Sequence, residues 1–248
     1  MSRPPEQGEP PAAEPAPAPA QPAPVAEPRQ RWRLVVGRSP DAPALAQREV
    51  GEAWAAALEG AELPLMAADS ATRTRPRISF GAPLPVGMAA EGELIDMVLV
   101  ERWPIWRVRE ALTGRLPAGW RLVDLFDVWL AGPPIAGRVA AADYRITLRA
   151  GLDVSGLERA AADLLGTESL PRERVKGAGT VTYDLRPLVI DLAIAPGPPA
   201  LVRTRTRFHP ELGTGRPEEV VAALRDLCGA PLEIDSIVRE RLVLADDL

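Results

Sequence analysis

The chain has 248 residues, of which 46% are hydrophobic and 25% are charged, and its formal net charge is −5. This composition is typical of a globular protein with one or two domains, and it excludes a collagen, a coiled-coil rod and a disulfide scaffold. A single cysteine, Cys228, and a single histidine, His209, leave few groups for thiolate metal sites or acid–base catalysis, which favours a non-enzymatic protein.

Residues 1–30 are rich in Pro, Ala and Glu, with Pro and Ala alternating from Pro15 to Pro19. Proline lacks a backbone donor and favours polyproline II, so the sequence predicts a disordered Pro/Ala-rich tail that forms no core. The tail is either an inert solubilising segment or a proline-rich ligand for a partner. It has no basic region followed by an apolar core, and no apolar run of the chain has membrane-spanning length. We therefore expect a cytoplasmic protein without membrane contact.

From Arg31 onward, alternating and helical apolar patterns predict the element order β-α-β-β-α-β. Val50, Trp54 and Leu58 recur at helical spacing, and Pro104 suits the first turn of the second helix. The predicted elements are a strand at 31–36, a helix at 45–61, strands at 77–80 and 94–101, a helix at 104–112 and a strand at 121–130.

Gly132-Pro133-Pro134 marks a linker, after which the same element order begins again. Pro217 and Gly229 are suited to the beginning and end of the last helix. The predicted elements are a strand at 144–149, a helix at 155–165, an extra hairpin at 172–184, strands at 188–195 and 201–209, a helix at 216–228 and a strand at 236–244.

The repeated order predicts an α+β protein made of two tandem ferredoxin-like (βαββαβ) units with antiparallel sheets. The first ferredoxin-like domain is expected at 31–131, and the second, with its extra hairpin, at 138–248. The two halves share the order of their elements but no convincing residue-by-residue identity.

The segment Pro76–Gly87, followed by Glu93-Leu94-Ile95-Asp96, resembles the radical-SAM-linked protein family, a bacterial domain family of unknown function. Tyr183-Asp184-Leu185-Arg186-Pro187 is similar to the second recurring motif of that family. The resemblance implies an accessory role, because family members are often fused to, or encoded beside, a radical SAM enzyme with a cobalamin-binding domain. Some lie near genes for ribonuclease E/G and ribosomal proteins, which implies a connection with RNA. The family-motif residues are Arg77, Ser79, Pro83, Pro85, Gly87, Asp96, Asp184, Arg186 and Pro187.

Two motifs of the family are missing from this chain. Family members commonly carry Ser-His-Leu-Asp at the start of the first helix, where this chain has Ala44–Glu49, and a Gln-Gly-Phe-Asn-Pro loop where it has Ser70–Arg75. Either the chain is a divergent member that lost a site, or those residues were never catalytic. Cys228 alone cannot hold the Fe–S cluster of a radical SAM enzyme, and no cofactor or metal is expected.

Arginine supplies nearly all the positive charge of the chain, because there is one lysine, Lys176. In the predicted strand 201–209, three arginines alternate with apolar or threonine residues, which places them on one face. In a ferredoxin-like sheet, this strand lies beside the strand at 144–149, whose arginines also share a face. The predicted RNA-binding set is Arg145, Arg149, Arg203, Arg205, Arg207, Arg239 and Arg241.

Guanidinium groups suit phosphate oxygens, and the open sheet of such folds is a platform for RNA, although paired stacking aromatics are absent from this set. The alternative is a solvated polar face that is neutralised by carboxylates, for which the candidates are Glu173, Asp184, Asp191 and Glu240. Asp184 and Arg186 are predicted to pair structurally across the bend before Pro187.

Three functions follow. The first is a non-enzymatic accessory of a separate radical SAM enzyme that binds RNA or a ribonucleoprotein on the arginine-rich face. The second is a protein-interaction scaffold without RNA binding. The third is an RNA-modifying enzyme, which the scarcity of acid–base residues disfavours.

Overall fold

The computed structural model describes residues 27–68, 75–149, 154–177 and 179–248. Residues 1–26, which make up most of the predicted tail, lie outside the described residues. The protein is a mixed α+β structure, and none of the helices described is long and apolar enough to cross a membrane.

The first half follows the predicted order β-α-β-β-α-β, with two additional short strands after the first helix. Its elements are β1 (Gln30–Arg38), α1 (Gln47–Gly60), β2 (Ala67–Ala68), β3 (Arg75–Pro76), β4 (Ile78–Phe80), β5 (Ala89–Leu99), α2 (Ile105–Leu112) and β6 (Trp120–Val128).

The second half repeats this order and contains the predicted extra hairpin. Its elements are η1 (Ile135–Gly137), β7 (Val139–Leu148), α3 (Val154–Gly166), β8 (Pro171–Lys176), β9 (Gly179–Asp184), η2 (Arg186–Leu188), β10 (Val189–Ala195), β11 (Leu201–His209), β12 (Gly213–Thr214), α4 (Pro217–Cys228), β13 (Ile234–Leu244) and η3 (Ala245–Asp247).

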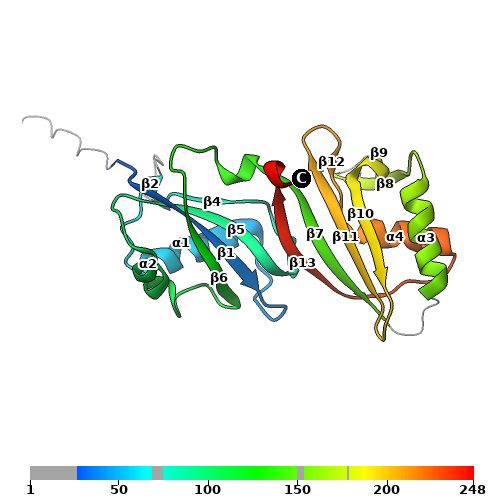
Figure 1. Cartoon of the computed structure of the whole chain (residues 1–248), viewed down its shortest axis with the longest axis horizontal. Coiled ribbons are helices and arrows are strands. Elements are labelled where there is room, and N and C mark those ends of the chain that lie inside the picture. Colours follow the sequence, from blue (N-terminus) through cyan, green and yellow to red (C-terminus); the bar gives the residue numbers. More distant parts are fainter. Residues whose placement is uncertain (1–26, 69–74, 150–153, 178) are drawn as a thin grey trace, which may run out of the picture.

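One nine-stranded sheet runs through both halves in the order β10-β11-β7-β13-β5-β1-β6, with β4 paired to β5 and β12 paired to β11 (Figure 1). Its neighbouring strands are antiparallel except β13 and β5, which pair in parallel where Val238 meets Ala89 and Arg239 meets Ala90. The sequence predicted two antiparallel sheets. This parallel pairing joins them into one mixed sheet.

In the first half, α1 and α2 cover one face of the sheet. Trp54 and Leu58 of α1 and Val108 and Leu112 of α2 are at most 1% exposed, because their helical spacing points them toward the strands. The indole ring of Trp54 meets that of Trp120 edge to face, with 5.4 Å between ring centroids. The strand residues of this core are Trp32, Leu34, Val36, Ile95, Met97, Leu99 and Leu125.

In the second half, α3 and α4 cover one face of the sheet in the same way. Pro217 is the first residue of α4, and Gly229 ends the helix with a φ of +64°, a conformation that glycine adopts without strain. This core contains Ile146, Leu148, Leu157, Ala160, Ala161, Leu164, Leu185, Leu188, Val189, Leu192, Val202, Val220, Val221, Ala223 and Leu224. The face that carries no helix is therefore left for polar residues.

A buried ion pair lies where the halves meet. Arg239 of β13 is 1% exposed, and its guanidinium donates hydrogen bonds of 2.7 and 2.5 Å to the carboxylate of Glu93 on β5. It also donates to the carbonyl oxygens of Pro83 (2.9 Å) and Ala82 (3.3 Å) in the β4–β5 connection. These bonds attach the connection of the first half to the last strand of the second half.

Candidate nucleic-acid interface

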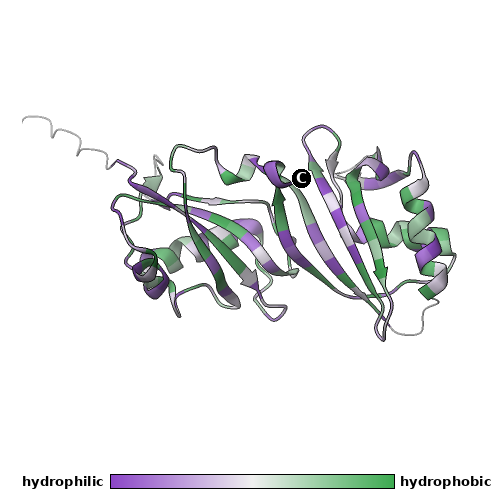
Figure 2. Cartoon of the chain, in the orientation of Figure 1, coloured by the Kyte–Doolittle hydropathy of each residue, from purple (hydrophilic) through white to green (hydrophobic). Residues whose placement is uncertain are grey.

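The side chains of strand β11 alternate between the two faces of the sheet, with apolar or threonine residues on one face and arginines on the other. Val202, Thr204 and Thr206 are at most 3% exposed and face the helices. Arg203, Arg205 and Arg207 have the opposite parity and lie on the face without helices, because successive side chains of a strand point to opposite sides. Figure 2 shows this alternation as hydrophilic and hydrophobic bands along the strands of the second half.

Strand register brings further charged residues onto this face, which we call the arginine face. On β7, Arg145 lies opposite Arg203 and Asp143 lies opposite Arg205. On β13, Arg241 lies opposite Asp143. The arginine face consists of Asp143, Arg145, Arg203, Arg205, Arg207 and Arg241.

Asp143 is the centre of a charged network on the arginine face. Arg205 donates to both of its carboxylate oxygens, at 2.6 and 3.0 Å, and Arg241 donates to one of them at 2.6 Å. Burial raises the pKa of Asp143, but the hydrogen bonds and positive charges of the two arginines outweigh burial and hold this pKa below its usual value. The hydrogen bond to Asp143 also raises the pKa of Arg205.

Two more of the predicted arginines pair with carboxylates. Arg145 contacts Glu91 of β5 at 2.5 Å and Glu240 of β13 at 3.3 Å. Arg149, beyond the end of β7, pairs with Glu233 at 2.7 Å. The alternative predicted from the sequence, a polar face that is neutralised by carboxylates, therefore fits Arg145, Arg149, Arg205 and Arg241. Of the four carboxylates named from the sequence, Glu240 forms one of these ion pairs, whereas Asp143, Glu91 and Glu233 were missed.

Arg203 and Arg207 differ from these paired arginines in their surroundings. Within the described ranges, neither guanidinium has a hydrogen-bond acceptor or an ion-pair partner. Arg203 is exposed and Arg207 is half-buried. They lie four residues apart on one face of β11, which corresponds to about 13 Å along an extended strand. They are the two cations of the arginine face that remain available to a ligand.

Arg239 does not belong to the arginine face. Two residues apart on a regular strand, Arg239 and Arg241 would point to the same side, which is what the sequence predicts. In the structure the register of β13 shifts between them, so that Arg239 lies opposite Tyr144 while Arg241 lies opposite Asp143. Because such an irregularity interrupts the alternation of the strand, the side chains beyond it point to the opposite face of the sheet. Arg239 is consequently buried against Glu93 and is unavailable to RNA.

The family-motif residues of the second half form structural contacts. The carboxylate of Asp184 accepts the backbone N–H groups of Leu170 (2.7 Å) and Arg186 (3.0 Å). Burial raises the pKa of Asp184, but these hydrogen bonds and the nearby Arg186 charge lower it overall. The guanidinium of Arg186 donates to the carbonyls of Leu165 and Val189, both at 2.8 Å. The bend that continues into Pro187 is thus held through the backbone rather than by a side-chain ion pair.

The family-motif residues of the first half are divided between the interior of that half and its junction with the second half. Asp96 is 2% exposed and accepts hydrogen bonds from Arg31 and Arg33, while Ser79 lies opposite it on β4. The Pro83 carbonyl accepts a bond from Arg239. Arg77 is exposed and contacts the Met66 sulfur at 3.8 Å.

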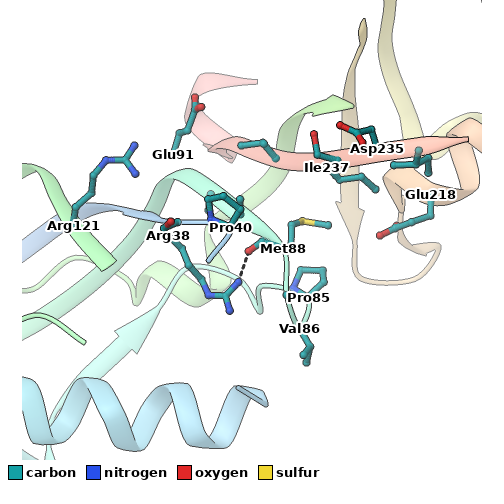
Figure 3. Close-up of a pocket in the computed structure, with 17 residues that line it drawn as sticks. Arg38, Pro40, Pro85, Val86, Met88, Glu91, Arg121, Glu218, Asp235 and Ile237 are labelled. Atoms are coloured by element: carbon teal, nitrogen blue, oxygen red, sulfur yellow. Dashed lines mark hydrogen bonds between the residues drawn. The ribbon is translucent and has the colours of Figure 1, made fainter. Parts of the chain in front are cut away.

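A pocket of about 620 Å³ lies at the junction, and Pro85 and Gly87 are among the residues that line it (Figure 3). Gly87 has a φ of +78°, which suits glycine in this turn. Arg121 lies on one side of the pocket, and the carboxylates of Glu218 and Asp235 lie on another. Arg38 is not available there, because its guanidinium donates to the carbonyls of Met88 (2.6 Å) and Pro43 (2.7 Å).

The single histidine and the single cysteine of the chain make structural contacts. The Nδ1 atom of His209 accepts backbone N–H groups from Glu211 (3.2 Å) and Leu212 (3.1 Å), so His209 shapes the turn after β11. Cys228 is half-buried and packs against the core of the second half. The described residues contain no cluster of His, Cys, Asp and Glu that is suited to a metal ion.

Comparison with known proteins gives a family and a weak structural likeness. Residues 31–219 match the model of the family described as "Uncharacterized protein conserved in bacteria (DUF2344)". A chain in the crystal structure of a Cbf5-Nop10-Gar1 complex is similar with a TM-score of 0.46 and 9% identity, over 84% of this chain and 49% of that chain. A chain in an archaeal box H/ACA sRNP Nop10-Cbf5 complex is similar with a TM-score of 0.40 and 11% identity, over 83% and 46%. This chain thus spans about half the length of those chains. No curated protein matches it.

Proposed function

The chain belongs to this family of uncharacterized bacterial proteins, since the matched residues make up most of its length, and we propose that it is a non-enzymatic accessory protein that binds RNA. The proposed RNA contact is the arginine face of the second half, with Arg203 and Arg207 on phosphates. The resemblance of Pro76–Asp96 to radical-SAM-linked proteins supports a separate radical SAM enzyme as the proposed partner. The proposed location is the cytoplasm.

The observation that carries this proposal is the pair of unpartnered guanidinium groups on one strand face. Each guanidinium presents a planar fork of N–H donors that fits phosphate oxygens. Arg203 and Arg207 project from the same side of β11, so an extended strand of RNA that runs along β11 meets both. A helix-free sheet face of this kind is a recurring platform for single-stranded RNA.

The paired arginines limit the strength of this contact. Asp143 neutralises one of the two charges of Arg205 and Arg241, and Glu91 and Glu240 neutralise Arg145. The net charge of −5 adds no long-range attraction for RNA. The proposed binding is therefore local, carried mainly by two charges, and sensitive to salt.

The proposed architecture behind this surface is a pair of ferredoxin-like units at 31–131 and 138–248. Within each half, the four main strands are antiparallel and follow the spatial order second, third, first, fourth, which supports this proposal. In both halves the two helices pack on one face and leave the other face open.

A protein-interaction scaffold is the second candidate, and a specific observation favours it. Strand β6 is an edge of the nine-stranded sheet, and within the described residues it pairs with β1 alone. Val123 of β6 is 47% exposed. An unpaired edge with apolar side chains is a template for an added strand from another protein. The third candidate, an RNA-modifying enzyme, has less support because His209 and Asp184 are engaged in structural hydrogen bonds.

Charge reversal on β11 tests the proposed function. In filter binding of RNA from the native cell, the full chain is expected to retain RNA, and the variant R203E/R207E is expected to lose most of this retention while remaining folded. The matched control R48E/R159E changes net charge equally at exposed helix positions away from the arginine face. Equal retention by the folded R203E/R207E variant and the wild type would contradict the proposal. Co-purification from the native cell that yields a protein partner and no RNA would favour the scaffold instead.

A further inference from the structure

A pocket of about 370 Å³ lies beside the open face of the first half, where the chain leaves β6. It is lined by Arg31, Arg33, Val128, Trp129, Gly132, Pro133, Arg138 and Asp246. None of these residues belongs to the arginine face. We propose that this pocket binds one nucleotide of single-stranded RNA, with the base stacked on Trp129 and the phosphate held by Arg33 and Arg138. This inference rests on the proposed RNA binding and adds a base-stacking contact to it.

Trp129 presents its ring to solvent and is nevertheless held in place. The residue is 76% exposed. A Cβ atom at Gly132 would lie 3.4 Å from the ring atom Cε3 of Trp129, so the ring packs against the backbone at Gly132. The backbone N–H of Gly132 also donates to the carbonyl of Trp129 at 3.1 Å. An aromatic ring that is both exposed and positioned is the kind of surface on which unpaired bases stack.

Arg31 fixes the loop that carries Trp129. Its side chain is 8% exposed, and it donates to Asp96 at 2.9 and 2.5 Å. It also donates to the carbonyl oxygens of Gly132 (2.8 Å) and Pro133 (2.9 Å). The loop is thereby attached to β1, and the stacking surface is formed before any ligand binds, which lowers the entropic cost of binding.

The pocket has spare hydrogen-bond donors and one surplus positive charge. Arg31 and Arg33 share the single carboxylate of Asp96, and Arg138 pairs with Asp246. Arg33 uses Nε and Nη2 on Asp96, which leaves Nη1 without an acceptor among the described residues. Arg138 uses one Nη2 contact, so its Nη1 and Nε atoms are likewise free within the described ranges. An anionic group is the ligand that these donors favour.

Phe126 extends the aromatic surface along β6. It lies directly opposite Arg33 on the neighbouring strand and is 48% exposed. Directly opposite residues of an antiparallel pair share a face, so this ring and the Arg33 side chain are neighbours. Two exposed aromatic rings beside arginines with free donors suit bases joined by phosphates better than they suit an apolar protein surface, which would leave the Arg33 and Arg138 donors unpaired.

Fluorescence anisotropy with a labelled oligouridine 12-mer tests this inference on the full chain. Trp129→Ala is expected to weaken binding about tenfold, the effect of losing one stacked base. Trp129→Phe retains an aromatic face and is expected to restore most of the affinity. Trp106→Ala is the matched control, because Trp106 is 64% exposed on α2, away from the pocket. Arg138→Gln is expected to reduce the slope of log affinity against log salt by about 0.7, whereas Trp129→Ala leaves this slope unchanged.

The outcomes separate this pocket from the arginine face. If R203E/R207E abolishes binding while Trp129→Ala and Arg138→Gln change nothing, the pocket inference is wrong and the proposed function stands. If the pocket variants weaken binding and R203E/R207E does not, the inference stands and the assignment of RNA to the arginine face is wrong. Absence of oligouridine binding by a wild-type chain that retains native-cell RNA overturns the pocket inference alone, and absence of both overturns the proposed function as well. Equal losses for Trp129→Ala and Trp129→Phe would rule out stacking.

Discussion

Arg239 and Glu93 form a buried ion pair across the junction of the two halves, with two hydrogen bonds from one guanidinium to one carboxylate. Arg239 is 1% exposed and Glu93 is 4% exposed. Burial lowers the pKa of Arg239, but the hydrogen bond and charge of Glu93 outweigh burial and raise it overall. Each buried charge is thus stabilised by the other, and the ion pair stabilises the junction of the two halves.

Arg239→Met is expected to destabilise the protein by about 3–5 kcal/mol, because it leaves the Glu93 carboxylate buried without a counter-charge. The change also removes the donors to the carbonyls of Ala82 and Pro83. Chemical denaturation measures the loss. The double variant R239M/E93L, which removes both charges, is expected to recover a large part of it. A loss below about 1 kcal/mol for the single variant would show that the pair does not hold the junction.

Gly92 allows β5 and β13 to approach each other. A Cβ atom at this position would lie 2.8 Å from the backbone oxygen of Glu240, a contact that neither strand can relieve without moving. Gly92→Ala is therefore expected to lower the free energy of unfolding by about 1–3 kcal/mol. Gly137→Ala is the control, since an added Cβ there meets nothing within 4 Å. Equal stability of the two variants in thermal melts would contradict the close pairing of β5 with β13.

The carboxyl of Asp143 links stability to pH. Its pKa is lower in the folded protein than its usual value, since Arg205 and Arg241 outweigh burial. Such a group stabilises the folded state above the unfolded pKa of about 3.9, and this stabilisation is lost as the pH falls through the folded pKa. Asp143→Asn is expected to cost about 1–2 kcal/mol at pH 7, and the difference from wild type is expected to shrink below about pH 4.

Urea denaturation at pH 7 and pH 3 measures this difference. Asp41→Asn removes an exposed carboxyl outside the arginine face and is the control. A difference between wild type and Asp143→Asn that stays constant from pH 7 to pH 3 would show that the Asp143 charge contributes nothing to stability.

Local periodicity explains what the sequence predicted well. The two βαββαβ patterns, the hairpin at β8 and β9, and the shared face of Arg203, Arg205 and Arg207 all follow from repeats of two or 3.6 residues. The partners of those arginines depend on strand register, which alternation within one strand does not determine. Asp143 meets Arg205 only through the pairing of β7 with β11.

The burial of Arg239 and the pocket at Trp129 were not predicted from the sequence, and each has a specific cause. The irregularity between Arg239 and Arg241 breaks the alternation that placed both on one face, and no local pattern marks it. The pocket at Trp129 combines β1, the β6–β7 connection and η3, so its residues come together only in the folded chain. The sequence feature that could have indicated this pocket is the spacing of Phe126 and Trp129 at the end of a predicted strand.

Asp143→Asn is also expected to strengthen RNA binding, whereas R203E/R207E is expected to weaken it. The substitution keeps the shape of the side chain but removes the charge that neutralises Arg205 and Arg241, so the arginine face gains one unit of positive charge. The slope of log affinity against log salt is expected to steepen by about 0.7 for single-stranded RNA. Filter binding over a salt series measures it, with Asp41→Asn as the control for a general change in net charge. Under the scaffold alternative no RNA contacts these arginines, so affinity and slope would stay at their wild-type values. A gain in affinity for Asp143→Asn but not for Asp41→Asn would place the RNA on the arginine face.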